Sequence, residues 1–385
     1  MTIFSFATTP SILSGPGAIG RLAEVAGTRL GARVLVVTDR GLVAAGIVGP
    51  VTAALEAVGI AVAVFDAVAA EPPESDALAA AEAARAHGAT GVLGLGGGSP
   101  MDVAKVAALL AGSGERLAEA YGVGNARGPR LPLALVPTTA GTGSEVTPIA
   151  ILTTGAAEKK GVVSPLLLPD LAVLDADLTL GLPPHVTAAT GIDAMVHAVE
   201  AYSSASPNNN PLSRSLAAEA LRLLGANIRT AVLKGQDREA RGAMLLGAML
   251  AGQAFANSPV AAVHALAYPI GSHFHVPHGL SNALVLAHVM RFNLEAAAGV
   301  YAEIAPCAFP ELDALPHADR AEAFIDQLAA LPAELGLPTR LREVGIEEDA
   351  LAMLAAEAMK QTRLLVNNPR PLLEADALAI YRAAW

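Results

Sequence analysis

The first half of the chain alternates short apolar runs with segments of helical composition, and this alternation constrains the fold more than any other feature. The apolar runs have the length of strands and lie at residues 33–38, 60–65, 90–95, 131–137 and 171–175. Helical stretches such as residues 51–58 and 75–87 lie between them. Strand–helix alternation predicts a parallel sheet with helices on both faces.

After about residue 180 the pattern changes to helices alone. Pro183 and Pro184 begin a helix. Further helical stretches lie at residues 216–224, 240–255, 260–267, 280–289, 321–331 and 348–359. The sequence therefore predicts two domains, an α/β domain over residues 1–180 and an all-α domain over residues 181–385.

Composition excludes several classes of protein. In 385 residues, 53% are apolar and only 16% are charged, which favours a folded globular chain over a disordered one. The net charge of −11 argues against a nucleic-acid partner or an anionic membrane surface. The single cysteine, Cys307, excludes an internal disulfide framework. The N-terminal residues lack the pattern of a secretory signal, so we expect a cytoplasmic protein.

Residues 242–290 contain no Asp, Glu, Lys or Arg, and a membrane span must be considered there. However, each window of about 20 residues includes polar or helix-breaking residues, among them Gln253, Asn257 and Pro259. The stretch therefore predicts buried helices that are polar at selected positions, and we expect no association with a membrane.

Two loops that follow predicted strands have the composition of nucleotide-binding loops. Gly96, Gly97, Gly98 and Ser99 lie between a strand and a helix. There, glycines let the backbone approach a phosphate and the helix N-terminus provides N–H donors. We favour phosphate binding over a tight turn that binds nothing. The hydroxyl-rich loop at residues 138–147 suits a pyrophosphate or a nicotinamide ribose, although a simple turn explains its composition equally well.

Asp39 follows the first strong strand. A carboxylate at this position can bind the diol of a ribose and repel a 2′-phosphate, which would favour NAD over NADP. The alternative is that Asp39 caps the helix that begins near Gly41. The sequence alone leaves both interpretations open.

Polar residues of two further segments can form a metal site. Asp193 and His197 are spaced i, i+4 and so share one face of a helix, where a hydrogen-bonded pair is the simpler interpretation. Four histidines occur within fifteen residues. They are His264, His273, His275 and His278.

Pro269, Gly271, Pro277 and Gly279 are expected to break the helix in this histidine segment, so that the chain turns back. His264 and His278 could then converge with Asp193 and His197. One carboxylate and three imidazoles suit Fe(II) or Zn(II). Satisfied core histidines remain the alternative.

These motifs together resemble the iron-containing, or group III, alcohol dehydrogenase family. The resemblance covers roughly residues 10–293. It rests on ordered motifs at residues 96–102, 138–145, 191–197 and 277–279, with Asp39, Lys159, Pro169, Asp175, Pro183, Pro184 and His264 between or around them. It implies a Rossmann-like α/β N-terminal domain and an all-α C-terminal domain.

The resemblance also implies the roles of individual residues. The implied metal ligands are Asp193, His197, His264 and His278. The implied NAD-binding residues are Asp39, Gly96, Gly97, Gly98, Ser99, Asp102, Thr138, Thr139, Thr142 and Lys159. Many members have a histidine four residues after the third ligand, where this chain has Tyr268. Tyr268 is therefore a candidate proton relay, although its ordinary pKa near 10 suits that role less well than histidine.

The function implied is a metal-dependent, NAD-linked oxidoreductase that interconverts a small primary alcohol or diol and its aldehyde. The alternatives are a hydroxyacid–oxoacid oxidoreductase or transhydrogenase of the same superfamily, a lyase that resembles dehydroquinate synthase, and a non-catalytic assembly protein. The charge-free stretch at 242–290 argues against the lyase, which would need several cationic residues around an acidic substrate. The expected partners are a small-molecule alcohol or aldehyde and further copies of the chain, as a dimer or larger homo-oligomer.

Overall fold

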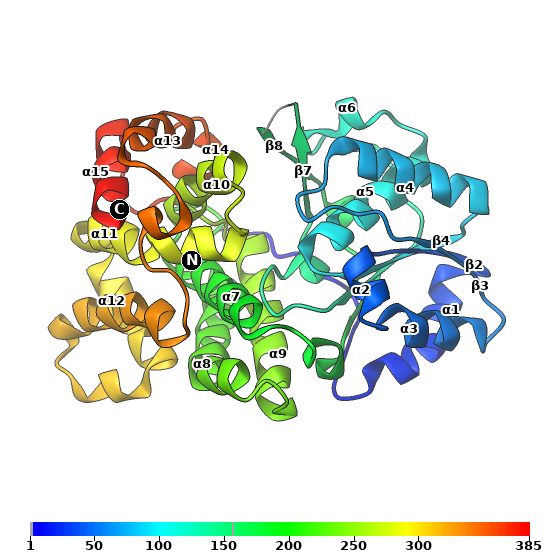
Figure 1. Ribbon diagram of the computed structural model, residues 1–385, viewed down its shortest axis with the longest axis horizontal. Coiled ribbons are helices and arrows are strands. Elements are labelled where there is room, and N and C mark those ends of the chain that lie inside the picture. Colours follow the sequence, from blue (N-terminus) through cyan, green and yellow to red (C-terminus); the bar gives the residue numbers. More distant parts are fainter. Residues whose placement is uncertain (1–2, 156–157) are drawn as a thin grey trace. The chain divides into compact units, whose positions relative to one another are not determined.

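The computed structural model describes residues 3–155 and 158–385, and these form two compact units. One unit spans Ala7–Gly181. The other spans Leu182–Trp385 and includes the described residues up to Phe6. The first is an α/β unit and the second is helical, which confirms the predicted fold class (Figure 1).

A six-stranded parallel sheet forms the centre of the α/β unit. Its strands, in spatial order, are β1 (Ile12–Ser14), β9 (Leu171–Leu174), β6 (Leu133–Pro137), β4 (Gly91–Gly96), β2 (Arg33–Val37) and β3 (Ala61–Phe65). Strands β4, β6 and β9 are buried along their whole length, as expected for a parallel sheet that is covered on both faces. The order of the strands reverses between β2 and β4, and this reversal defines a topological switch point.

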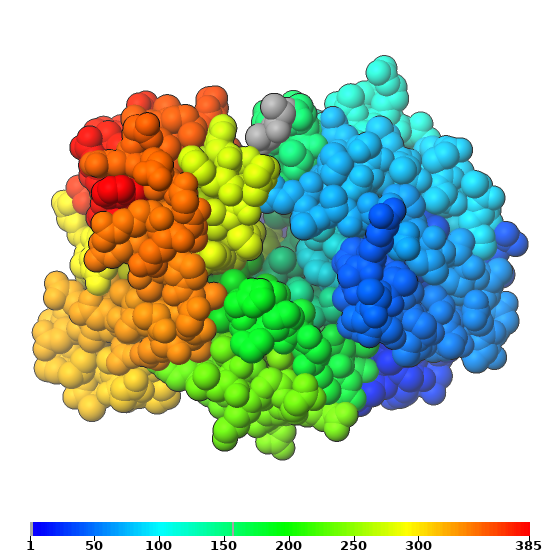
Figure 2. Space-filling view, in the orientation of Figure 1, coloured from blue at the N-terminus to red at the C-terminus, as the bar shows by residue number. Residues whose placement is uncertain are grey.

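Helices cover both faces of this sheet. Successive residues of a strand point to opposite faces. Val34 and Val36 accordingly pack with α1 (Leu22–Leu30) and α3 (Val48–Glu56), whereas Leu35 and Val37 pack with α4 (Glu74–His87) and α5 (Gly98–Ser113) (Figure 1). The short helix α2 (Arg40–Ala44) has no buried residue and lies at the surface of the unit (Figure 2).

A second, smaller sheet was not predicted from the sequence. It contains β5 (Gly122–Val123), β8 (Glu158–Val163) and β7 (Ile149–Thr154), in that order, and α6 (Leu117–Ala120) precedes β5. Strand β7 pairs with β8 in antiparallel register. The β7 strand alternates between half-buried and buried positions, which suits a sheet with one covered face.

The helical unit consists of long helices followed by shorter ones. The long helices are α7 (Pro184–Ser203), α8 (Pro211–Leu233), α9 (Arg238–Asn257), α10 (Ala262–Phe274), α11 (His278–Ala308) and α12 (His317–Glu334). The shorter helices are α13 (Leu351–Ala358), α14 (Thr362–Leu365) and α15 (Glu374–Ala384). Helix α7 packs against α8, α9 and α11 and is therefore central to the unit.

The expected helix breaks are only partly correct. Pro269 and Gly271 lie inside α10, and Gly279 lies inside α11. The chain turns at His275, which ends α10 with a left-handed φ of 55°, and at Pro277, which precedes α11. A buried helix tolerates an internal proline where packing outweighs the lost backbone hydrogen bond, so Pro269 does not end α10.

Within residues 3–155 and 158–385, one helix, α11, is long and apolar enough to span a membrane. The core helix of a soluble protein meets the same criteria, and α11 packs against α7, α8 and α12. The length and composition of α11 are therefore weak evidence for a membrane span.

Candidate metal centre and cofactor-binding loops

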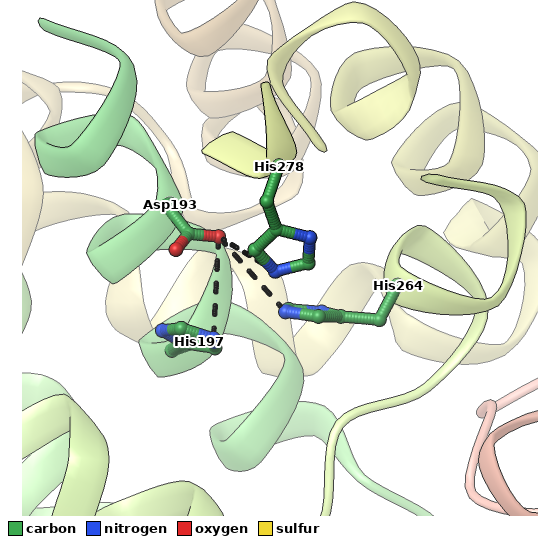
Figure 3. Close-up of side chains that lie close together, drawn as sticks. All are labelled: Asp193, His197, His264 and His278. Atoms are coloured by element: carbon green, nitrogen blue, oxygen red, sulfur yellow. Dashed lines mark ion pairs between the residues drawn. The ribbon is translucent and has the colours of Figure 1, made fainter. Parts of the chain in front are cut away.

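Four predicted metal ligands converge inside the helical unit (Figure 3). One ligand atom from each of Asp193, His197, His264 and His278 lies within 4.8 Å of the others. The Oδ1 atom of Asp193 is 4.0 Å from Nε2 of His197, 4.0 Å from Nε2 of His264 and 3.6 Å from Nε2 of His278. The three imidazoles thus face a single carboxylate oxygen.

Three helices position these side chains. Helix α7 carries Asp193 and His197 one turn apart, α10 carries His264 in its first turn, and His278 begins α11. The rings of His197 and His264 are stacked with their centroids 4.7 Å apart. The side chains of Asp193, His197 and His264 are buried, whereas 40% of the His278 side chain is exposed. The cluster is therefore open on the side of His278.

The electrostatics of the cluster favour an ionised Asp193. Burial alone would raise the pKa of this carboxyl group, but positive charge on the facing imidazoles and the hydrogen bond from Asn282 outweigh the desolvation and hold the pKa below its ordinary value. A charged carboxylate is the form that binds a metal ion.

The donor set and its dimensions fit a divalent transition metal. Metal–nitrogen bonds of about 2.1 Å in a tetrahedron place neighbouring ligand atoms about 3.4 Å apart. The observed separations of 3.6 and 4.0 Å from Asp193 Oδ1 are slightly larger, so small side-chain movements would close them onto an ion. One oxygen and three imidazole nitrogens are ligands that iron(II) and zinc(II) share.

Two polar residues beside the cluster were missed in the sequence. Glu200 Oε2 lies 2.6 Å from Nδ1 of His264. Asn282 Nδ2 donates to Asp193 Oδ1 at 2.6 Å and lies 3.3 Å from Nε2 of both His264 and His278. Their spacing would have indicated them, because Glu200 is one turn beyond His197 and Asn282 is one turn beyond His278.

A close approach of two helix backbones fixes the position of His278. Gly279 lies against α7, and a Cβ atom at this position would lie 2.8 Å from the carbonyl carbon of Ala189. Only glycine avoids this clash. The backbone of α11 therefore contacts that of α7 one residue after the ligand.

Tyr268 also lies beside the cluster, on α10 one turn after His264. Its ring centroid is 5.9 Å from that of His278 and 6.4 Å from that of His264. The other two histidines of this segment, His273 and His275, are exposed at the end of α10.

The predicted cofactor-binding residues gather at the carboxyl edge of the parallel sheet. Asp39 follows β2, the glycine loop follows β4, and the loop that begins at Thr138 follows β6, which are three neighbouring strands. The first two of these loops flank the switch point, where ligands of open α/β sheets bind.

The glycine loop and the threonine loop are in close contact. A Cβ atom at Gly98 would lie 3.0 Å from the methyl carbon of Thr142, and one at Gly97 would lie 3.5 Å from Thr139 Oγ1. Gly97 caps the N-terminus of the sixteen-residue helix α5, and so N–H groups point toward this loop. The arrangement fits a phosphate group at the N-terminus of α5.

The structure shows that Asp39 caps a helix. Its Oδ1 atom accepts a hydrogen bond from the backbone N–H of Leu42, 3.0 Å away, at the start of α2. This contact uses one carboxylate oxygen, so the ribose-binding role and the capping role are compatible.

Two other predicted cofactor residues make contacts within the protein. Lys159 donates to Glu71 Oε2 at 2.8 Å and to Thr153 Oγ1 at 2.9 Å. Ser99 Oγ donates to the carbonyl oxygen of Ala70. The adjacent residues Ala70 and Glu71 thus bind Ser99 and Lys159, respectively.

Asp102 and Lys105 connect α5 to the threonine loop. Asp102 accepts hydrogen bonds from Ser144 Oγ at 2.7 Å and from the backbone N–H of Ile151 at 2.9 Å. The fully buried Lys105 ammonium donates to Ser144 Oγ at 2.8 Å and to two further oxygens of the 147–149 segment. We define Asp102, Lys105, Ser144 and Glu145 as the loop cluster.

Burial shifts the ionisation of this loop cluster. Desolvation lowers the pKa of Lys105 to about 8, and the charges of Asp102 and Glu145 oppose this decrease. Desolvation also raises the pKa of Glu145 to about 7. Neither Lys105 nor Glu145 was singled out as a functional residue in the sequence.

The α/β unit is doubly wound and has a glycine loop at its switch point, and the helical unit has one aspartate and three converging histidines. This combination is typical of nucleotide- and metal-dependent enzymes. The model of the iron-containing alcohol dehydrogenase family matches residues 9–176, and that of its C-terminal part matches residues 187–385. The chain therefore belongs to the iron-containing alcohol dehydrogenase family.

Individual relatives span nearly the whole chain. Long-chain-alcohol dehydrogenase 1 of Geobacillus thermodenitrificans is 43% identical, over 96% of this chain and 94% of that protein. A crystal structure of 1,3-propanediol oxidoreductase superposes with a TM-score of 0.95 at 35% identity and covers all of both chains. The sulfoacetaldehyde reductase of Bifidobacterium kashiwanohense, solved in complex with NAD+, gives a TM-score of 0.89 at 29% identity over 100% of this chain and 99% of that chain.

Proposed function

We propose that this protein is an iron-dependent, NAD-linked dehydrogenase that interconverts a small primary alcohol or diol and its aldehyde. The observation that carries this proposal is the convergence of Asp193, His197, His264 and His278. The named activities of similar proteins, on long-chain alcohols and 1,3-propanediol, support the substrate class.

The four converging side chains are proposed to hold the metal. When bound, the metal supplies Lewis-acid polarisation of the substrate oxygen, and the nicotinamide supplies hydride transfer. Asp193 contributes the negative charge, and the three Nε2 atoms contribute neutral donors. The exposed edge of His278 leaves room for a substrate oxygen on that side of the cluster.

The carboxyl edge of the sheet is proposed to hold NAD. Gly96, Gly97, Gly98 and Ser99 would hold the pyrophosphate at the N-terminus of α5. Asp39 would bind the adenosine ribose and repel a 2′-phosphate. Thr138, Thr139 and Thr142 would line the nicotinamide side, with Lys159 and Asp102 near the cofactor. The sulfoacetaldehyde reductase solved with NAD+ supports this choice of cofactor.

The decisive experiment measures NADH formation by the Fe(II)-reconstituted protein under anaerobic conditions, with and without a chelator. The substrates are ethanol, butanol, 1,2- and 1,3-propanediol, glycerol, a long-chain primary alcohol, and 2- and 4-hydroxybutyrate, and NADP replaces NAD in a parallel series. Chelator-sensitive oxidation of neutral alcohols with NAD is expected. Turnover of the hydroxy acids alone would contradict the proposal and favour a hydroxyacid oxidoreductase.

Tyr268 is proposed to relay a proton between the substrate and solvent. Its position beside both His264 and His278 supports this role. Tyr268→Phe removes the hydroxyl group and keeps the ring, so we expect kcat to fall about tenfold and the pH profile to change, while metal content stays the same. An unchanged rate and pH profile would remove Tyr268 from the mechanism.

The oligomeric state and the cytoplasmic location remain predictions. Light scattering on the purified, metal-loaded protein distinguishes a monomer from the proposed dimer or larger homo-oligomer.

A further inference from the structure

Glu200 holds two consecutive residues at the start of α10. Its side chain is buried, with 5% exposed. Oε1 accepts a hydrogen bond from the backbone N–H of Val263 at 2.7 Å, and Oε2 lies 2.6 Å from Nδ1 of His264. One carboxylate of α7 therefore contacts both the backbone of the first turn of α10 and the metal-ligand candidate in that turn.

This contact determines which nitrogen of His264 carries the proton. An ionised carboxylate only accepts hydrogen bonds, so the proton of a neutral imidazole must be on Nδ1. The lone pair is then on Nε2, which is the atom that faces Asp193 Oδ1 at 4.0 Å. The opposite tautomer would place a proton where a metal ion must bind.

The charge of Glu200 also suits a cation at this place. A divalent ion held by Asp193 and three neutral imidazoles leaves one positive charge in a buried site. A second carboxylate, acting through the ring of His264, compensates this charge and strengthens the imidazole as a donor.

We propose that Glu200 is a positioning residue of the metal centre, which fixes the tautomer and the orientation of His264. The inference rests on the metal site of the proposed function. A purely structural role, as a partner for the N-terminus of α10, is the alternative.

Glu200→Gln separates these two roles. The glutamine can keep its amide oxygen on the Val263 N–H and thus preserve the structural contact. Its NH2 group then faces Nδ1 of His264 as a donor, which favours the tautomer with the proton on Nε2. Glu303→Gln is the matched control, because Glu303 is exposed on α11 and accepts a hydrogen bond from the Tyr202 hydroxyl group.

The test titrates the metal-free full-length proteins with Zn(II) and Co(II) against a chromogenic chelator. For Glu200→Gln we expect a 10- to 100-fold loss of metal affinity and an altered Co(II) absorption spectrum. Glu303→Gln should match the wild type in both measurements. Thermal unfolding of the metal-free proteins should give similar midpoints for all three, because the contact with Val263 persists.

The outcomes separate the two proposals. If the wild type binds metal and Glu200→Gln has the same affinity and Co(II) spectrum, the positioning role is wrong and the metal site stands. If the wild type binds neither ion, both proposals are wrong. If Glu200→Gln does not fold, 1H–15N spectra of the metal-free wild-type protein decide. A proton on Nδ1 of neutral His264 supports the proposal, because no metal then imposes that tautomer, and a proton on Nε2 overturns it.

Discussion

Each compact unit contains a buried polar cluster, and the two clusters differ in the source of their positive charge. The loop cluster of the α/β unit includes the ammonium group of Lys105, which faces Asp102 and hydroxyl oxygens of the threonine loop. In the metal-ligand cluster of the helical unit, which comprises Asp193, His197, His264 and His278, the carboxylates of Asp193 and Glu200 lie beside imidazole rings. In the loop cluster, the charged groups are paired with side-chain and backbone groups of the same unit. In the cluster of Asp193 and the histidines, lone pairs converge on one point, where a metal ion can bind them.

The balance of charge within each cluster distinguishes a structural cluster from a ligand site. A buried cation with three oxygen partners stabilises the segments that it joins, and its removal leaves uncompensated carboxylates. Lone pairs that face one point repel one another, and so a cation at that point supplies what the protein lacks. Substitutions in the first cluster should therefore change folding, and those in the second should change metal binding.

The largest effect is expected for Asp193→Ala, which removes the carboxylate that all three imidazoles face. Metal affinity should fall by more than about a hundredfold, and alcohol oxidation should be lost with it, because this is a direct ligand. Metal analysis after gel filtration, together with NADH formation, measures both. Asp326→Ala is the control, since Asp326 pairs with Arg291 on the surface. A variant that retains metal and full activity would contradict the assignment of the cluster.

Lys105→Met should lower the free energy of unfolding by about 3–5 kcal/mol, because it leaves Asp102 and Glu145 buried without their cation. Urea denaturation of the metal-free protein measures this change. Lys360→Met, at an exposed ion pair with Glu357, should cost less than about 1 kcal/mol. Metal affinity should match the wild type in both variants. If Lys105→Met has normal stability but binds metal more weakly, the structural role assigned to the loop cluster is wrong.

The smallest effect concerns the pH dependence of stability. Because burial raises the pKa of Glu145 from 4.5 to about 7, the folded chain keeps a proton that the unfolded chain releases in this range. The contribution of Glu145 to the free energy of unfolding should therefore decrease as pH rises from about 4.5 to 7.

Glu145→Gln removes this titration. Between about pH 4.5 and 7, the free energy of unfolding of the variant should rise relative to that of the wild type by up to about 1.4 kcal/mol per pH unit. Denaturation at a series of pH values, with the metal-free proteins, compares the two curves. Parallel curves would show that Glu145 does not titrate in this range.

Much of the fold could be predicted because its signals are local. The apolar runs at residues 33–38 and 90–95 were recognised as strands, since a fully buried parallel strand is a continuous apolar run. Strand β8 was missed, because Glu158, Lys159 and Lys160 give it a charged sequence and its stability comes from pairing with β7. Pro269 was expected to end a helix that continues past it, because tertiary packing outweighs local preference.

The candidate site was predictable where residue type and spacing coincide. The i, i+4 spacing of Asp193 and His197 placed them on one helical face, but the sequence could not show that His264 and His278 reach the same point. Glu200 could be placed only in part. Its spacing puts it one turn beyond His197 on α7, but its contacts with Val263 and His264 belong to α10 and cannot be read from the sequence.

The contact at Gly279 has a consequence for protein engineering. Because the backbones of α7 and α11 touch there, the spacing between Asp193 and His278 is set by main-chain atoms. Replacing a neighbouring side chain by a larger or smaller one would therefore not change the distance between Asp193 and His278, and so would not change which ion fits the site. The practical route is to exchange a ligand type, for example an imidazole for a thiolate, and to let the coordination preferences of each ion decide the selectivity.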